Sequence, residues 1–297
     1  MDLNKLNETQ REAVVSTEGP LLVMAGAGSG KTRVLTNRIA YLIESKSVFP
    51  SEILAFTFTN KAAKEMRNRV ESLIGNVSGG MWIGTFHALS VRMLRRDIEK
   101  LGYTKDFVIY DSDDQLTLLR QVVKALSIDE KKTPPKHFRA KISEAKNEMV
   151  SPEDYTGLYG NDYGSLQAAK VYELYQKQLK ANNAMDFDDL ILKTVELLTS
   201  FEDVRAYYKR KFQYILVDEY QDTNKAQYTL IKLLANERHN VCVVGDLDQS
   251  IYGWRGADIR NIRDFEKDYP EAKTVILEQN YRSTAHIEQF KNKDKKS

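Results

Sequence analysis

The chain has 297 residues, 42% of them hydrophobic, and 44 lysines and arginines nearly balance 42 aspartates and glutamates. This length supports one large or two modest domains, and the formal net charge of +2 is too small to indicate nucleic-acid binding by itself. With no signal peptide and no apolar run near the roughly 20 residues that span a bilayer, we expect a cytoplasmic protein without a membrane partner. The single cysteine, Cys242, excludes an internal disulfide.

Short apolar runs rich in β-branched residues predict a series of strands, and most of them precede a segment with helical periodicity. This alternation predicts an α/β fold, in which helices cover both faces of a parallel sheet. The predicted strands are 21–25, 53–58, 81–85, 214–218, 241–245 and 273–277.

Residues 25–32 read Ala-Gly-Ala-Gly-Ser-Gly-Lys-Thr and lie between the first predicted strand and a helical stretch. This is the pattern of a phosphate-binding loop, whose glycines let backbone N–H groups approach a triphosphate at a helix N-terminus. We expect Lys31 to reach the β- and γ-phosphates and Thr32 to offer its hydroxyl to Mg²⁺. The general pattern has glycine where this chain has Ala25, although the strand, loop and helix context is complete.

Gln10 lies upstream of this loop and has two interpretations. Its side-chain amide offers one donor and one acceptor, which matches the N6 and N7 edge of adenine. Asn7 and Gln10 also have the spacing of a capping box, with Gln10 at the third helical position. The sequence leaves both interpretations open.

A long interval, roughly 105–210, separates the third and fourth strands and has little strand character apart from 107–110. It predicts an inserted all-α subdomain with helices at 112–127, 136–148, 163–181 and 187–200. The expected organisation is a nucleotide-binding domain in two parts, a mainly helical insert between them and a short basic tail. The ranges are 1–106 and 211–284 for the domain, 107–210 for the insert and 285–297 for the tail.

Polar clusters follow the predicted strands, so a parallel sheet would bring them together at one edge. The apolar run 214–217, followed by Asp218 and Glu219, has the form of a Walker B strand. There Asp218 would hold Mg²⁺, and Glu219 would orient and deprotonate the attacking water. The alternative is that the two acids cap the next helix.

The segment 248–256 places aromatic residues and an arginine next to the same edge. Flanking glycines and polar neighbours suit rings that stack on bases beside a cation, although tyrosine and tryptophan usually pack in cores. Phe58, between two threonines at a strand end, has the same two interpretations. His87 taken alone is more often structural.

The order and spacing of these motifs resemble the UvrD/Rep/PcrA family of superfamily 1 DNA helicases, most closely its PcrA-type members. The resemblance covers nearly the whole chain, and in that family alanine at the first position of the phosphate loop is normal. The motifs that carry it are 6–10, 25–32, 57–63, 85–87, 218–223, 245–256 and 279–284.

The resemblance implies a RecA-like P-loop NTPase that uses ATP and Mg²⁺ to move 3′-to-5′ on single-stranded DNA. It implies that Gln10 and Tyr281 hold adenine and that Gln249 senses the γ-phosphate. It assigns the catalytic roles to Glu219, Lys31, Gln249 and Arg282, and Mg²⁺ to Thr32 and Asp218. It places the ATP contacts at Gln10, Gly26, Ala27, Gly28, Ser29, Gly30, Lys31, Thr32, Arg33, Tyr281 and Arg282.

For DNA, the resemblance implies single strands and duplex/single-strand junctions as partners, with repair, replication and transcription-coupled pathways all open. The acids beside Phe187 need no metal, because Asp186 can cap a helix. The implied DNA contacts are Thr57, Phe58, Asn60, Thr85, His87, Phe187, Tyr252, Trp254 and Arg255.

Family members continue with a second RecA-like domain after the 281–284 motif, whereas here only the lysine-rich residues 285–297 follow. We therefore expect a monomeric motor half whose missing partner is that C-terminal domain. Because an arginine finger contributes a factor of about 10³ to 10⁵ in rate, hydrolysis should be weak and unwinding absent. The alternative is a non-catalytic module that binds ATP or single-stranded DNA, or an interaction fragment. A GTPase is disfavoured, because residues 60–63 lack the aspartate of Asn-Lys-x-Asp.

Overall fold

The computed structural model describes residues 2–26, 28–75, 80–160, 162–246 and 260–277. Internal contacts divide the chain into two compact units, which are described separately. The predicted insert covers 107–210, whereas the second compact unit begins at His87 and includes a short stretch near residue 230. Unit 1 comprises Met1–Phe86, Ala206–Thr223 and Leu234–Ser297, and unit 2 comprises His87–Arg205 and Asn224–Leu233.

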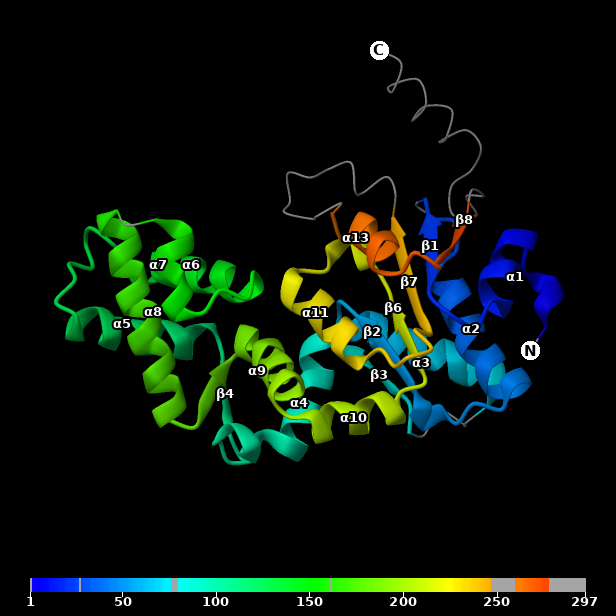
Figure 1. Ribbon diagram of the computed structural model, residues 1–297, viewed down its shortest axis with the longest axis horizontal. Helices are drawn as coiled ribbons and strands as arrows, with labels where there is room; N and C mark the ends of the chain where they lie inside the picture. The colour runs from blue at the N-terminus through cyan, green and yellow to red at the C-terminus, as the bar shows by residue number, and fades with distance from the viewer. Residues whose placement is uncertain (1, 27, 76–79, 161, 247–259, 278–297) are drawn as a thin grey trace, which may run out of the picture. The chain divides into compact units, whose positions relative to one another are not determined.

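Unit 1 is built on a six-stranded sheet in the order β3-β2-β6-β7-β1-β8, in which all neighbouring strands are parallel (Figure 1). This confirms the predicted α/β fold. Each predicted strand is present to within one residue at either end. The strands are β1 (Leu21–Ala25), β2 (Ile53–Thr57), β3 (Trp82–Thr85), β6 (Tyr214–Val217), β7 (Val241–Asp246) and β8 (Lys273–Leu277).

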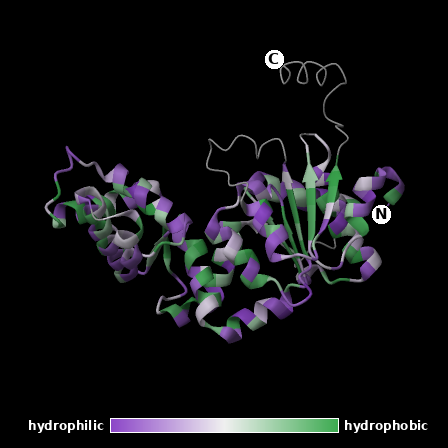
Figure 2. Ribbon diagram, turned by 45° about the horizontal axis from the view of Figure 1, so that its top comes forward, coloured by the Kyte–Doolittle hydropathy of each residue, from purple (hydrophilic) through white to green (hydrophobic). Residues whose placement is uncertain are grey.

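The central strands β1, β2, β6 and β7 are buried along their whole length. Figure 2 shows the hydrophobic character of the sheet. Strands of a parallel sheet covered on both faces have continuous apolar runs, which explains why their sequences do not alternate. β8 lies at the edge, and of its residues Val275 and Leu277 are buried. The core of unit 1 is therefore centred on the sheet.

Local sequence sets where the helices of unit 1 begin. α3 (Asn60–Ile74) is capped by Thr59, whose hydroxyl oxygen accepts a hydrogen bond from the Ala62 N–H at 3.0 Å. α2 (Lys31–Lys46) begins directly after Gly30. The other helical segments are α1 (Glu8–Val15), α13 (Arg260–Asp268) and the short 3-10 helices η1 (Leu3–Lys5), η2 (Pro50–Glu52) and η4 (Tyr220–Asp222).

Unit 2 is mainly helical, and the helices predicted in the insert are present to within two residues. It also contains a two-stranded parallel sheet of β4 (Val108–Tyr110) and β5 (Ala184–Asp186). β4 lies in the stretch 107–110 that has strand character in the sequence, whereas β5 was not predicted in the all-α insert. Helices α7 and α10 were not predicted either. The helices wholly or partly in unit 2 are α4 (Phe86–Asp97), η3 (Ile98–Leu101), α5 (Ser112–Ala125), α6 (Pro135–Asn147), α7 (Pro152–Tyr159), α8 (Tyr163–Ala181), α9 (Phe187–Ser200), α10 (Glu202–Lys211) and α11 (Lys225–Leu234).

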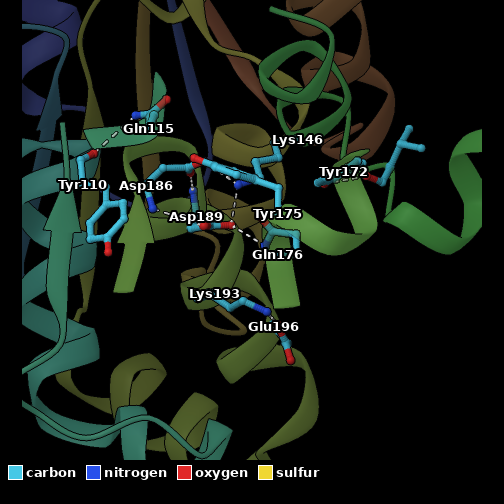
Figure 3. A network of polar contacts seen from close by, with 11 residues as sticks. Tyr110, Gln115, Lys146, Tyr172, Tyr175, Gln176, Asp186, Asp189, Lys193 and Glu196 are labelled. Carbon is cyan, nitrogen blue, oxygen red and sulfur yellow. Dashed lines mark hydrogen bonds and ion pairs between the residues drawn. The ribbon is translucent and has the colours of Figure 1, made fainter. Parts of the chain in front are cut away.

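A buried charged cluster holds the N-terminus of α9 (Figure 3). Lys146 of α6 is fully buried, and its Nζ lies 2.6 Å from Asp186 Oδ2 and 2.9 Å from Asp189 Oδ1. Asp186 caps α9, because its Oδ1 accepts a hydrogen bond from the Asp189 N–H at 2.9 Å. The Tyr175 hydroxyl donates to Asp186 at 3.0 Å, and the Gln176 amide donates to Asp189 at 3.1 Å. This confirms the predicted N-cap at Asp186.

In this cluster one positive charge faces two carboxylates. Burial and the neighbouring Asp186 charge raise the pKa of Asp189 to about 6. Burial opposes ionisation of Asp186 too, but Lys146 and the hydrogen bonds to its carboxylate hold the pKa of Asp186 below its ordinary value. The two carboxylates raise the pKa of Lys146 despite its burial. Asp189 is therefore the member of the cluster that takes up a proton as the pH falls.

The raised pKa of Asp189 predicts a pH-dependent contribution to stability. Between about pH 4 and 6 the folded chain binds a proton that the unfolded chain does not, so this contribution is present at acidic pH and is lost as the pH rises through about 6. Asp189→Asn removes it. We expect the stability of this variant, relative to the original chain, to increase from about pH 5 to 7.5 in denaturant titrations.

Asp203→Asn is the control. A hydrogen bond from Lys100 lowers the pKa of Asp203, so this carboxyl is ionised in both folded and unfolded chains across that range. Its stability difference from the original chain should be flat. An equally flat difference for Asp189→Asn would contradict the raised pKa.

Candidate functional site

The predicted phosphate loop connects β1 to α2. Its backbone is in the left-handed region at Gly28 (φ +78°) and Gly30 (φ +96°), a conformation that glycine adopts without strain. The Ser29 hydroxyl donates to the Gly26 carbonyl at 2.8 Å. Gly30 is the N-cap of α2, and within the described part of the chain no side chain caps this helix. Its first N–H groups are suited to an anion such as phosphate.

Gln10 contacts this loop from α1. Its Nε2 donates to the Ser29 carbonyl at 3.0 Å, and the side chain is almost fully buried. The capping box with Asn7 is also present. The capping interpretation of Gln10 is therefore correct, and its contact with the loop is compatible with the adenine contact, which stays a prediction.

Arg38 of α2 fixes the other end of α1. Its buried guanidinium donates to the carbonyls of Ala13, Ser16 and Thr17, at the C-terminal end of that helix. Carbonyls at a helix C-terminus carry partial negative charge, so they are good partners for a buried cation. Arg38 thereby helps to place the helix that carries Gln10.

Lys31 joins three strand ends. Its Nζ lies 3.0 Å from Glu219 Oε2 and 3.0 Å from Asp246 Oδ2. Glu219 follows β6, and the fully buried Asp246 ends β7, which neighbours both β6 and β1. The two carboxylates raise the pKa of Lys31 although burial opposes this. The expectation that polar strand ends meet at one edge of the sheet holds for these three residues.

Asp246 was not among the predicted catalytic or binding residues. Its only sequence signal was its place at the end of an apolar strand, in the polar cluster that begins at Gly245. Asp246 pairs with Lys31, which is far away in the sequence, so no local motif predicts this contact.

Asp218 and Glu219 have different environments. Asp218 is buried, and burial together with the Glu219 charge raises the pKa of Asp218 to about 6. Its Oδ1 accepts a hydrogen bond from the Glu219 N–H at 3.0 Å. Glu219 has a left-handed backbone (φ +47°), which is unusual outside glycine and is found at functional sites. Neither acid caps α11, because Asn224 does so by accepting from the Gln227 N–H at 2.9 Å.

The other predicted ATP contacts are the neighbours of Lys31 on α2. Thr32 is the second residue of the helix, as the phosphate-loop pattern requires for a hydroxyl ligand of Mg²⁺. Arg33 instead donates to the Lys5 carbonyl, which directs its guanidinium to η1.

The predicted DNA contacts of unit 1 lie at the ends of β2 and β3. Thr57 is buried at the end of β2, Asn60 is exposed at the start of α3, and Thr85 ends β3. Phe58 is half-buried and meets the buried Phe86 edge-on, with ring centroids 5.6 Å apart. The contact with Phe86 bears out the packing interpretation of Phe58, and the half-buried side chain is compatible with base stacking, which stays a prediction.

The predicted DNA contacts of unit 2 form an aromatic pair. The rings of His87 and Phe187 lie 6.0 Å apart at 81° to each other. Phe187 is the first residue of α9, just after Asp186, and is 47% exposed. Burial lowers the pKa of His87, although the nearby Asp188 opposes this. The charged cluster around Lys146 thus holds the turn that presents an exposed aromatic ring.

Some predicted residues fall outside the described part of the chain, and their roles stay predictions. These residues are Ala27, Gln249, Tyr252, Trp254, Arg255, Tyr281 and Arg282.

A sequence model for the UvrD/REP helicase N-terminal domain matches residues 6–270. The chain belongs to this family. It is 58% identical over 285 residues to the proteins named ATP-dependent DNA helicase PcrA from Staphylococcus epidermidis (strain ATCC 12228 / FDA PCI 1200) and Staphylococcus aureus (strain COL). The alignment covers 96% of this chain and 39% of each relative, so the chain spans about two fifths of their length.

Membership of the UvrD/REP helicase family confirms the resemblance drawn from the motifs and is consistent with a RecA-like sheet. The helices that the structure describes include none long and apolar enough to cross a membrane. The same residues contain no group of three or more His, Cys, Asp or Glu side chains placed to hold a metal ion.

The phosphate loop of this helicase-family chain predicts a strong preference for glycine at position 30. A Cβ there would lie 2.7 Å from Gln10 Nε2, and the left-handed backbone adds strain. Gly30→Ala should lower the free energy of unfolding by about 1–2 kcal/mol in denaturant titrations.

Gly157→Ala is the control of opposite sign. Gly157 lies within α7, and a Cβ there has no heavy atom within 4 Å. Alanine should raise stability by about 0.5–1 kcal/mol, because it is the better helix former. The account of the loop is contradicted if Gly30→Ala is as stable as the original chain.

Proposed function

We propose that this chain carries the ATP-hydrolysing site of a helicase that moves 3′-to-5′ along single-stranded DNA. The observation that carries the proposal is the contact of Lys31, in a phosphate loop, with carboxylates at the ends of two neighbouring strands. Membership of the UvrD/REP family and the names of the relatives support ATP and DNA as the substrates. The resemblance supports the polarity.

The first turn of α2 would bind the phosphates of ATP. A triphosphate carries more negative charge than either carboxylate, so we expect Lys31 to exchange Glu219 and Asp246 for phosphate oxygens when ATP binds. Gln10 would hold adenine at the side of the loop. The hydroxyl of Thr32 and the carboxylate of Asp218 are the oxygen ligands that suit Mg²⁺, which would neutralise phosphate charge there.

Glu219 would act as the general base for hydrolysis. The water oxygen attacks the γ-phosphorus, the bond from that phosphorus to the ADP oxygen breaks, and the water proton passes to Glu219. Within the described residues, the hydrogen bonds to this carboxylate fall on Oε2. Oε1 can therefore accept the proton. Gln249 and Arg282 would add contacts to the phosphates, as the resemblance implies.

Single-stranded DNA would stack on the exposed aromatic residues. Phe187 offers an accessible ring edged by His87, and Phe58 offers a partly accessible one. Bases stack on such rings without sequence preference, which suits a motor that moves along any strand. Asn60 and Thr85, at a helix start and a strand end, would add polar contacts, whereas the side chain of Thr57 is buried, so the contact implied there would come from its main chain.

We assign the nucleotide site to unit 1, and the DNA contacts at His87 and Phe187 to unit 2. The resemblance further suggests a cytoplasmic monomer at duplex/single-strand junctions. A second RecA-like domain would supply the remaining contacts to ATP and DNA.

Two substitutions separate binding of ATP from its hydrolysis. Lys31→Ala should abolish binding of a fluorescent ATP analogue, because the phosphates lose their main cation. Glu219→Gln should bind ATP as the original chain does and lose about 10² to 10⁴ in single-turnover hydrolysis, because the base is absent.

Lys131→Ala, at an exposed position of unit 2, is the control and should change neither quantity. GTP should compete less well than ATP. Wild-type hydrolysis by Glu219→Gln would refute the catalytic assignment, and unchanged ATP binding by Lys31→Ala would refute the site itself.

The DNA proposal predicts that Phe187→Ala weakens binding of a fluorescein-labelled oligothymidine. Base stacking on an aromatic side chain contributes about 1–3 kcal/mol, so the Kd should rise by about 5- to 150-fold in fluorescence anisotropy.

Tyr163→Ala is the matched control, because Tyr163 is a 77% exposed aromatic residue at the start of another unit 2 helix. It should bind DNA with unchanged affinity. Equal effects of the two substitutions, or none, would argue against the stacking role of Phe187.

A further inference from the structure

Gln221 forms hydrogen bonds with both residues that Lys31 contacts, Glu219 and Asp246. It lies in η4, four residues after the end of β6, and is only 1% exposed. Its Nε2 donates to Glu219 Oε2 at 2.8 Å, and its Oε1 accepts from the main-chain N–H of Asp246 at 3.0 Å. One buried amide therefore connects the acid that follows β6 to the last residue of β7.

The two partners fix the orientation of this amide. A carboxylate can only accept hydrogen bonds and a main-chain N–H can only donate. Turning the amide over would place its oxygen against the Glu219 carboxylate and its NH₂ group against the Asp246 N–H. Gln221 thus presents a donor to Glu219 in a fixed direction.

The backbone beneath the amide leaves it little freedom. A Cβ at Gly245 would lie 3.4 Å from Gln221 Oε1, so the side chain rests directly against the end of β7. Glu219 needs such an anchor, because its side chain is 36% exposed and its backbone is in the left-handed region. Without a fixed partner, an exposed carboxylate samples several rotamers.

Lys31 and Gln221 both donate to the same oxygen of Glu219, and we expect only Gln221 to keep this hydrogen bond when ATP binds. Lys31 is expected to turn to the phosphates, whereas Gln221 is tied to the main chain of β7 and stays. Gln221 would then be the donor that keeps Oε2 in place and leaves Oε1 directed at the attacking water.

We propose that Gln221 is a positioning residue for ATP hydrolysis, which orients the Glu219 carboxylate and ties it to the end of β7. The proposal rests on the function proposed above for Glu219. It predicts that loss of the amide donor lowers kcat for ATP and leaves the KM for ATP unchanged, because Gln221 acts on the base and not on the nucleotide.

Two substitutions test this. Gln221→Leu removes both hydrogen bonds without adding a charge, and Gln221→Glu keeps the shape and the acceptor for the Asp246 N–H but, when ionised, sets a second carboxylate against Glu219 in place of the donor. We expect kcat to fall about 10- to 100-fold in both, the size of effect that a misplaced catalytic group produces. Binding of a fluorescent ATP analogue and the thermal midpoint are measured on the same samples, and analogue binding should match that of the original chain.

Gln227→Leu is the control for loss of a buried glutamine. Gln227 is also buried, and its Oε1 accepts from the main-chain N–H of Asn224 at 3.0 Å, in unit 2. This variant should lose stability and keep kcat. If Gln221 had only a structural role, its variants would behave like Gln227→Leu. Their thermal midpoints would fall and their kcat would stay unchanged.

The outcomes separate this inference from the proposed function. If Glu219→Gln hydrolyses ATP at the original rate, both the catalytic role of Glu219 and the positioning role of Gln221 are contradicted. If Glu219→Gln is inactive while Gln221→Leu keeps the original kcat, the inference about Gln221 is overturned and the function stands. A raised KM with unchanged kcat would also overturn it.

Discussion

The ion pairs of Lys31 with Glu219 and Asp246 are the interaction on which unit 1 depends for its site. Asp246 is fully buried, and a buried carboxylate is tolerated only when it is paired and hydrogen-bonded. Lys31 follows β1 through the phosphate loop, Glu219 follows β6, and Asp246 ends β7, and these three strands are neighbours in one parallel sheet. In a parallel sheet the carboxyl ends of these strands lie at the same edge, so the two ion pairs of Lys31 depend on the fold.

Unit 2 also contains a lysine that contacts two carboxylates. Fully buried Lys146 holds Asp186 and Asp189, and these two carboxylates close the capping box at the start of α9. In each unit one lysine contacts two acids, of which one is the last residue of a strand and the other lies two or three residues beyond a strand. In unit 1 these contacts position Glu219, the base of the proposed reaction. In unit 2 they hold the helix start that carries the exposed ring of Phe187.

Sequence predicted the large sheet from continuous apolar runs and four helices of the insert from their helical periodicity, because both signals are local. It missed β5, whose three residues pair with β4, far away in the chain. It missed α7, because Pro152 and Gly157 are residues typical of turns, whereas Pro152 occupies a first-turn position after the Ser151 N-cap. The phosphate-loop and Walker B patterns identified Lys31 and Glu219, but Asp246 and Gln221 join the site through long-range contacts that no spacing reveals.

The most direct test of the account is a crystal structure of the chain grown with a non-hydrolysable ATP analogue. The account predicts that Lys31 Nζ contacts phosphate oxygens and no longer bridges Glu219 and Asp246, while Gln221 still donates to Glu219. An analogue bound away from α2, with both ion pairs of Lys31 intact, would contradict it.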